Sequence, residues 1–163
     1  MKREEVNPQV KNALGQFIQS TMKTWNGFIT QRPILYEDFN KWLIPKKNIT
    51  NAGGCLTIDS YENPYLLNAK SVLKAKEIVN AAHYSPMSGM FWHTNNDNEG
   101  NRVYYTFSLD KAVFKYADPN TGEIREDWDD EGWTVRSFDI NKDKPFWHCV
   151  WTAGRRFSFG FVR

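Results

Sequence analysis

The spacing of hydrophobic residues changes once along the chain, from a helical period to alternation. From Val10 to Trp25 apolar residues recur every three to four positions, which predicts an amphipathic helix. Asn7 and Pro8 precede this stretch in the order that is preferred at a helix start. The same spacing predicts a short helix over 35–43 and a third helix over 68–82. We therefore expect the helical part of the chain at about 7–82.

After Pro86 the chain alternates between apolar and polar residues, as β-strands do. The predicted strands lie near 55–59, 90–94, 103–109, 112–117, 133–140, 146–153 and 156–162. Their short connections cannot carry parallel crossovers, so we expect one mostly antiparallel meander over about 90–163. Helices followed by strands predict an α+β fold, with the N-terminal helices packed on one face of the C-terminal sheet. The length and the absence of a linker-like segment predict a single domain over 1–163.

The tripeptide Phe-Trp-His occurs twice in the strand-rich part, at 91–93 and at 146–148. Alternation along a strand places the two tryptophans toward the helices and the Phe and His residues on the opposite face. The same alternation assigns three further polar residues to that opposite face. The candidate binding residues are therefore Phe91, His93, Tyr104, Thr106, Phe146, His148 and Arg156. By the same alternation, two sets of residues are expected to face the helices: Val103, Tyr105, Phe107 and Leu109, and Phe157, Phe159 and Phe161.

Composition adds a high aromatic content and an uneven distribution of charge. Aromatic residues make up 15% of the chain, which suits a stiff core or a contact surface. The formal net charge of +2 does not indicate binding to nucleic acid or to an anionic membrane. Residues 118–131 hold seven acids and one arginine, which predicts a solvated acidic loop. On that interpretation, neutralising Asp127, Asp129 and Asp130 leaves folding unchanged; the alternative is a docking site for a basic partner.

Candidate chemistry is sparse. His83, His93 and His148 lack the spacing of a metal site, so no metal and no cofactor are predicted, and His83 is expected to cap the third helix. Cys55 and Cys149 are too few for a disulfide framework and are expected to be reduced thiols. The N-terminus has no signal-peptide pattern, and no apolar run approaches the ~18 residues of a membrane helix. We therefore expect a soluble, cytoplasmic protein.

The absence of a catalytic motif favours a non-enzymatic binding or assembly protein, such as a small viral or phage accessory or structural component. Its partner would be another protein or a second copy of the chain; nucleic acid stays possible, and a membrane is not expected. The alternative is a small metal-independent nuclease, with His93 and His148 as acid and base and Arg156 holding the phosphate. In a third interpretation, each histidine merely borders the core and hydrogen-bonds a neighbour.

Overall fold

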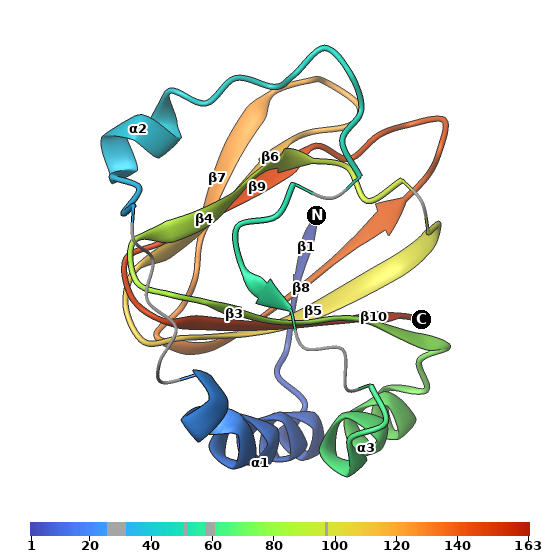
Figure 1. Ribbon diagram of the computed structural model, residues 1–163. Helices are drawn as coiled ribbons and strands as arrows, with labels where there is room; N and C mark the ends of the chain where they lie inside the picture. The colour runs from blue at the N-terminus through green and yellow to red at the C-terminus, as the bar shows by residue number, and fades with distance from the viewer. Residues whose placement is uncertain (26–31, 51, 58–60, 97) are drawn as a thin grey trace.

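The computed structural model describes residues 1–25, 32–50, 52–57, 61–96 and 98–163, with only the backbone for 22–25. Two β-sheets face each other, and helices lie against their outer surfaces (Figure 1). The helices are α1 (Pro8–Trp25), α2 (Tyr36–Asn40) and α3 (Pro64–Leu73). Helices α1 and α3 lie beneath the lower sheet of Figure 1, whereas α2 lies beside the upper one.

The lower sheet has six strands and the upper sheet has four. In spatial order, the six-stranded sheet contains β1 (Lys2–Glu4), β8 (Gly132–Ile140), β5 (Gly100–Ser108), β10 (Arg156–Val162), β3 (Glu77–Tyr84) and β2 (Leu56–Thr57). The four-stranded sheet contains β4 (Ser88–His93), β9 (His148–Thr152), β6 (Ala112–Ala117) and β7 (Ile124–Trp128). From β3 to β10 the chain passes repeatedly between the sheets, which is the arrangement of a jelly roll.

The predicted α+β fold is confirmed, with N-terminal helices on one face of an antiparallel sheet. The single meander is wrong. Most of the short connections lead the chain into the opposite sheet, so consecutive strands are seldom neighbours. The acidic segment contains β7, a strand at one edge of the four-stranded sheet, where the sequence indicated only a loop. Exposed charged residues are typical of an edge strand. Such a strand lacks the alternation of apolar and polar residues from which a strand is predicted.

The third predicted helix begins and ends too late. Asn63 caps α3 by accepting a hydrogen bond from the backbone N–H of Tyr65, and Pro64 occupies the first turn. Lys74 ends the helix in the left-handed conformation at φ 52°. Residues 77–84 form β3 and pair with β10, although 77–82 were expected to be helical. His83 therefore lies in a strand and does not cap a helix. A strand buried on both faces has a nearly continuous apolar run, which also fits helical spacing.

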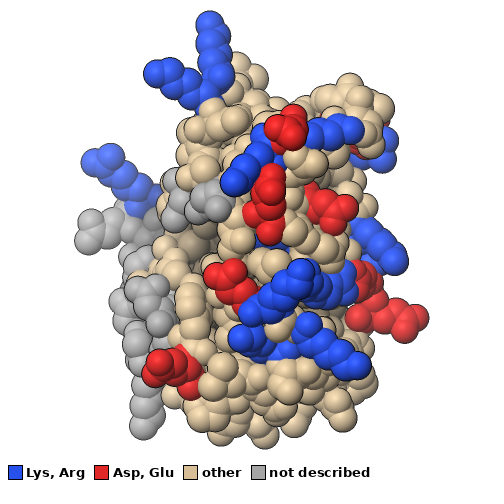
Figure 2. All heavy atoms as spheres, turned by 90° about the vertical axis from the view of Figure 1, so that its right-hand side faces the viewer, with Lys and Arg blue, Asp and Glu red and all other residues tan. Residues whose placement is uncertain are grey.

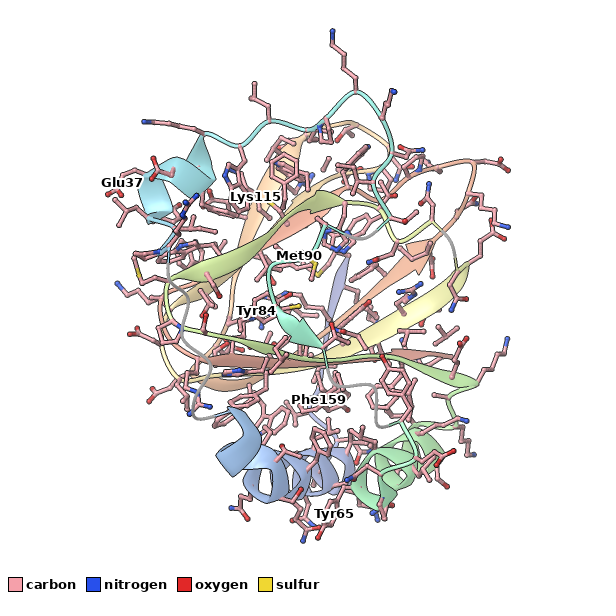
Figure 3. The ribbon with its side chains drawn as sticks, in the orientation of Figure 1. Glu37, Tyr65, Tyr84, Met90, Lys115 and Phe159 are labelled. Carbon is pink, nitrogen blue, oxygen red and sulfur yellow. The ribbon has the colours of Figure 1, made fainter. Side chains whose placement is uncertain are left out.

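The main core lies between the six-stranded sheet and helices α1 and α3. Val10, Leu14 and Phe17 of α1 are buried against the sheet, and the rings of Phe17 and Phe159 meet edge to face at 5.6 Å. Phe159 points toward the helix layer in Figure 3. Asn7 caps α1 as predicted, because its side chain accepts hydrogen bonds from two backbone N–H groups of the first turn. The predicted orientation toward the helices is confirmed for Val103, Tyr105, Phe107, Phe157, Phe159 and Phe161. It is wrong for Leu109, which follows the end of β5 and is 56% exposed.

A smaller core covers the outer face of the four-stranded sheet. Phe39 of α2 packs there with Trp92, Cys149 and Trp151, and the indole N–H of Trp151 donates to the carbonyl of Ile34 at 2.8 Å. Both cysteines are free thiols. Within the described segments, no helix has the length and apolar character needed to cross a membrane. On the side of the molecule drawn in Figure 2, acidic and basic side chains are interspersed.

Candidate functional site

A cavity of about 360 Å³ lies between the two sheets. Tyr84 and Met90 point into this interior space from opposite sheets in Figure 3. We call it the inter-sheet pocket. Its lining residues are Thr50, Thr57, Tyr61, Glu77, Ile78, Val79, Asn80, Tyr84, Met90, His93, Asn95, Asn98, Arg102, Tyr104, Thr106, Phe114, Arg136, Phe138, His148, Val150, Arg156 and Ser158. The lining therefore combines an apolar half with a dense set of polar and cationic groups.

His93 and His148 meet at this pocket, with ring centroids 4.1 Å apart. They come from the adjacent strands β4 and β9, which pair at these two residues. Nδ1 of His93 lies 2.8 Å from the carbonyl oxygen of Phe91, and Nδ1 of His148 lies 2.9 Å from that of Phe146. Because a carbonyl oxygen only accepts, each Nδ1 carries the proton. Each neutral ring therefore has its lone pair on Nε2.

Burial keeps both imidazoles neutral. Desolvation, with a smaller contribution from the nearby Arg102, lowers the pKa of His93 to about 4, although the hydrogen bond to the carbonyl of Phe91 acts in the opposite direction. The pKa of His148 is lowered well below the usual value, first by burial and then by His93. A general acid and base should titrate near the working pH. The lowered pKa values argue against the metal-independent nuclease mechanism for this pair, because burial disfavours the doubly protonated imidazole that a general acid needs.

Asn95 completes a cluster with the two histidines. Its Nδ2 lies 3.1 Å from Nε2 of His148, the one ring nitrogen of His148 that can accept a hydrogen bond. In the described part of the chain, no three His, Cys, Asp or Glu side chains converge in a way that could hold a metal ion. The cluster instead consists of two imidazoles and one carboxamide, and we call it the His-His-Asn cluster.

Three buried arginines of the six-stranded sheet also line the pocket: Arg102, Arg136 and Arg156. Two of them share Asp129, whose side chain is 1% exposed. Arg136 approaches one carboxylate oxygen at 2.7 Å, and Arg156 approaches the other at 2.8 Å. Despite its burial, Asp129 has a pKa far below the usual range because of these two guanidinium groups and a hydrogen bond from Ser108. Arg156 therefore has a permanent internal counter-ion.

Most of the predicted face comes together, but inside the protein and not on an exposed surface. His93, Tyr104, Thr106, His148 and Arg156 all line the pocket.

The two phenylalanines of the repeated tripeptide separate. Phe146 is buried beside His148 at 5.4 Å between ring centroids. Phe91 packs on the outer face of the sheet against Trp42. The pairing of β4 with β9 shifts between Met90 and His93, so strict alternation fails at this irregularity.

Sequence reasoning missed Asn95, Arg102, Asp129 and Arg136. The spacing His93-x-Asn95 was visible, but an amide is not among the ligands that metal-site patterns normally require. Asp129 looked like one more residue of an acidic loop. Its partners lie on β8 and β10 of the other sheet, so only the tertiary structure reveals the ion pairs.

No family profile matches the chain, and no curated protein matches it. Solved structures do resemble it. A prolyl-4-hydroxylase of Pseudomonas putida has a TM-score of 0.54 at 14% identity, over 99% of this chain and 91% of that chain. A prolyl hydroxylase of Trichoplax adhaerens, in complex with a peptide from a hypoxia-inducible factor, has a TM-score of 0.53 at 13% identity, over 96% of this chain and 79% of that one. At such low identity the likeness shows the fold alone.

The chain thus has the fold of two hydroxylase enzymes. This finding contradicts the expected non-enzymatic binding or assembly protein, whose support was the absence of a catalytic motif. It also leaves the expected viral or phage component without support.

Proposed function

We propose that this protein is a metal-dependent enzyme of the hydroxylase class, with its active site in the inter-sheet pocket. One observation carries the proposal: His93 and His148 lie 4.1 Å apart between ring centroids, and each is fixed as the Nδ1–H tautomer. Histidines that bind metals through Nε2 typically donate Nδ1–H to a backbone carbonyl or a carboxylate, which fixes the ring and its tautomer. Neutral imidazole is also the protonation state that binds a metal.

The donor set fits a divalent transition metal, with one departure. Two histidines and one carboxylate are the usual ligands of non-haem Fe(II) in oxygenases. Asn95 stands beside the two rings with its Nδ2 3.1 Å from Nε2 of His148. Its carboxamide would have to turn over to free that nitrogen for the ion and to offer a neutral oxygen in place of a carboxylate. His93, His148 and Asn95 would hold the ion. Such a ligand set adds no negative charge, so the affinity for the ion is expected to be weaker than with an acidic third ligand.

A bound Fe(II) ion would supply the oxidising chemistry, which no side chain of the protein can provide. The protein's own residues would shape the site around it. Phe138 and Phe146, at 4.6 Å between ring centroids, keep water from the back of His148. Two backbone carbonyls hold the imidazoles in place. The likeness to prolyl hydroxylases supports an oxidative reaction. It does not indicate the substrate, which the residues that line the pocket would select.

Binding of Co(II) under anaerobic conditions tests the metal site, because its visible absorption reports coordination directly. We expect one ion per chain, and we expect His93→Ala and His148→Ala each to abolish binding. His83→Gln is the matched control, because His83 lies on β3 and does not line the pocket. Co(II) binding that persists in both alanine variants contradicts the proposal, as does a parent protein that binds neither Co(II) nor Fe(II).

A second variant tests the role of Asn95. We expect Asn95→Asp to tighten Co(II) binding by about an order of magnitude, because it adds one negative charge to the ligand set. Unchanged affinity in Asn95→Asp would remove Asn95 from the ligand set.

Oxygen consumption by the Fe(II)-loaded protein, followed with a panel of peptides and small acids, then tests the enzyme class.

A further inference from the structure

Within the described segments, β7 is the one edge strand that is both long and uncovered. It has five residues, Ile124–Trp128, and pairs with β6 on one side only. The edge strands β1 and β2 have three and two residues. β4 is longer, but the chain at Gly54 lies so close to it that a Cβ there would overlap the carbonyl of Gly89. We infer that β7 pairs with β7 of a second copy of this chain, so that the protein forms a dimer.

The outward backbone groups of β7 belong to every second residue. The N–H of Asp129 donates to the carbonyl of Ala112 on β6, and in an antiparallel pair such bonds recur at alternate residues. The residues that direct N–H and C=O away from the sheet are therefore Ile124, Glu126 and Trp128. In the described part of the chain, the only partner of these groups is Arg3, which donates to the carbonyl of Trp128. Such a row of unpaired groups is a template for another strand.

The sequence of β7 is complementary to itself when a second copy runs antiparallel. Only the register centred on Glu126 pairs all five residues. It places Ile124 opposite Trp128 at both ends of the paired segment. Between them, Arg125 faces Asp127. Facing apolar side chains and facing opposite charges both stabilise an antiparallel pair, whereas a register centred on Arg125 or on Asp127 would place like charges opposite each other.

The Arg125 and Asp127 side chains both have capacity for this contact. Arg3 and Arg136 donate to the same oxygen of Asp127, Oδ2, so Oδ1 accepts no hydrogen bond from the described residues. The Arg125 side chain is 48% exposed, and only its Nη2 is engaged in ion pairs with acids of its own copy. Facing residues without backbone hydrogen bonds have the closest side chains of a ladder, which suits an ion pair.

Exposed apolar side chains lie beside the same edge. Ile124 is 44% exposed and Trp128 is 39% exposed. The rings of Trp128 and Tyr36 have centroids 5.6 Å apart, and Leu35, which precedes Tyr36, is 50% exposed. A second copy paired along β7 would cover these side chains and remove apolar area from water.

This inference goes beyond the proposed function and does not depend on it. Among the described residues that line the inter-sheet pocket, none belongs to β7. Association of two copies can therefore be measured in EDTA, without a metal ion. If Co(II) binding fails while the dimer forms, the proposed function falls and this inference stands.

Sedimentation velocity of the full chain over a concentration series tests for the dimer. We expect a reversible monomer–dimer equilibrium. Ile124→Lys should weaken the dimer by about tenfold or more, because two-fold symmetry makes each substitution act twice. Leu67→Lys is the matched control, since Leu67 has the same exposed fraction, 44%, but lies on α3 outside the other sheet. A monomer at all concentrations overturns the inference, as does equal dimer affinity in the two variants.

A cross-link tests the register, because Glu126 faces its own copy at the two-fold axis. Facing residues of a hydrogen-bonded antiparallel pair have Cα atoms about 5.5 Å apart, within the range that a disulfide spans. Glu126→Cys should therefore form a disulfide-linked dimer under mild oxidation, and Leu67→Cys should not. Glu126→Gln should tighten the parent dimer by about two- to fivefold, because two facing carboxylates are removed. A missing cross-link in Glu126→Cys overturns the inference, as does a Glu126→Gln dimer no tighter than the parent's.

Discussion

At the scale of single residues, the repeated Phe-Trp-His has a structural meaning. In both copies the His side chain donates Nδ1–H to the carbonyl of the Phe two residues earlier, so the tripeptide itself fixes the ring. The sequence showed the repeat and allowed both histidines to be placed on one face. It could not show that this face is enclosed, because enclosure depends on a second sheet whose strands are distant in the chain.

The neutral state of His93 predicts an acid-sensitive stability. Its pKa is lowered to about 4, so between pH 6.5 and 4 the unfolded chain binds a proton that the folded protein excludes. Stability contributed by the neutral ring is therefore complete above pH 6.5 and falls with pH by about 1 kcal/mol per unit in this window. Urea unfolding at a series of pH values in EDTA measures this slope. His93→Gln should flatten it, whereas equal slopes in parent and variant would mean that His93 titrates normally.

At the scale of secondary structure, the spacing of apolar residues predicts a strand correctly where the strand has one apolar face. It misleads where both faces are buried or both are exposed. β6, β8 and β10 lie within a residue or so of their predicted bounds. The spacing of apolar residues in β3 also fits a helix, because this strand is buried on both faces. In β7 the apolar Ile124 and Trp128 are separated by three charged residues and are exposed, so the strand has no buried apolar face for the pattern to reveal. The order of strands in each sheet was beyond prediction, since most neighbours in the sheets are not neighbours in the chain.

The packing of β10 against β5 gives a prediction about glycine. In Gly160→Ala the new Cβ would lie 2.5 Å from Cε1 of Tyr104, whose ring is held by Phe138 and Arg102. We expect a loss of about 1–3 kcal/mol in the free energy of unfolding, the usual range for overpacking. Chemical denaturation measures it. Gly15→Ala is the control of opposite sign: Gly15 lies inside α1 with nothing within 4 Å of the added Cβ, so the variant should gain about 0.5–1 kcal/mol. A neutral Gly160→Ala would show that the ring can move aside.

At the scale of the whole molecule, one ion-pair network joins the two sheets and the N-terminal strand. Asp127 belongs to β7 of the four-stranded sheet, and Asp129 is the first residue after the end of that strand. Their partners are Arg3 on β1, Arg136 on β8 and Arg156 on β10, all in the six-stranded sheet. The expectation that neutralising these acids leaves folding unchanged is therefore wrong for Asp129, which is buried between two guanidinium groups.

Asp129→Asn should cost about 3–5 kcal/mol in the free energy of unfolding, because it leaves two buried guanidinium groups without their shared counter-ion. Asp130→Asn is the matched control. That side chain is 72% exposed and, among the described residues, pairs only with Arg3, so the expected loss is below about 1 kcal/mol. Equilibrium denaturation of both variants measures the difference. Similar losses would mean that the network contributes through general charge and not through the buried pairs.

The alternation of the chain between the two sheets also determines when the pocket can form during folding. His93 ends β4, and its neighbour in space, His148, begins β9, with β5, β6, β7 and β8 between them in the chain. Strand pairs so distant in sequence require closure of long loops before they contribute stability, and proteins rich in such pairs fold slowly. The histidine pair therefore cannot assemble from either half of the chain alone. The pair forms only when the two sheets of the jelly roll close on each other. The pocket therefore cannot bind or react before the last strands of the chain have folded into place.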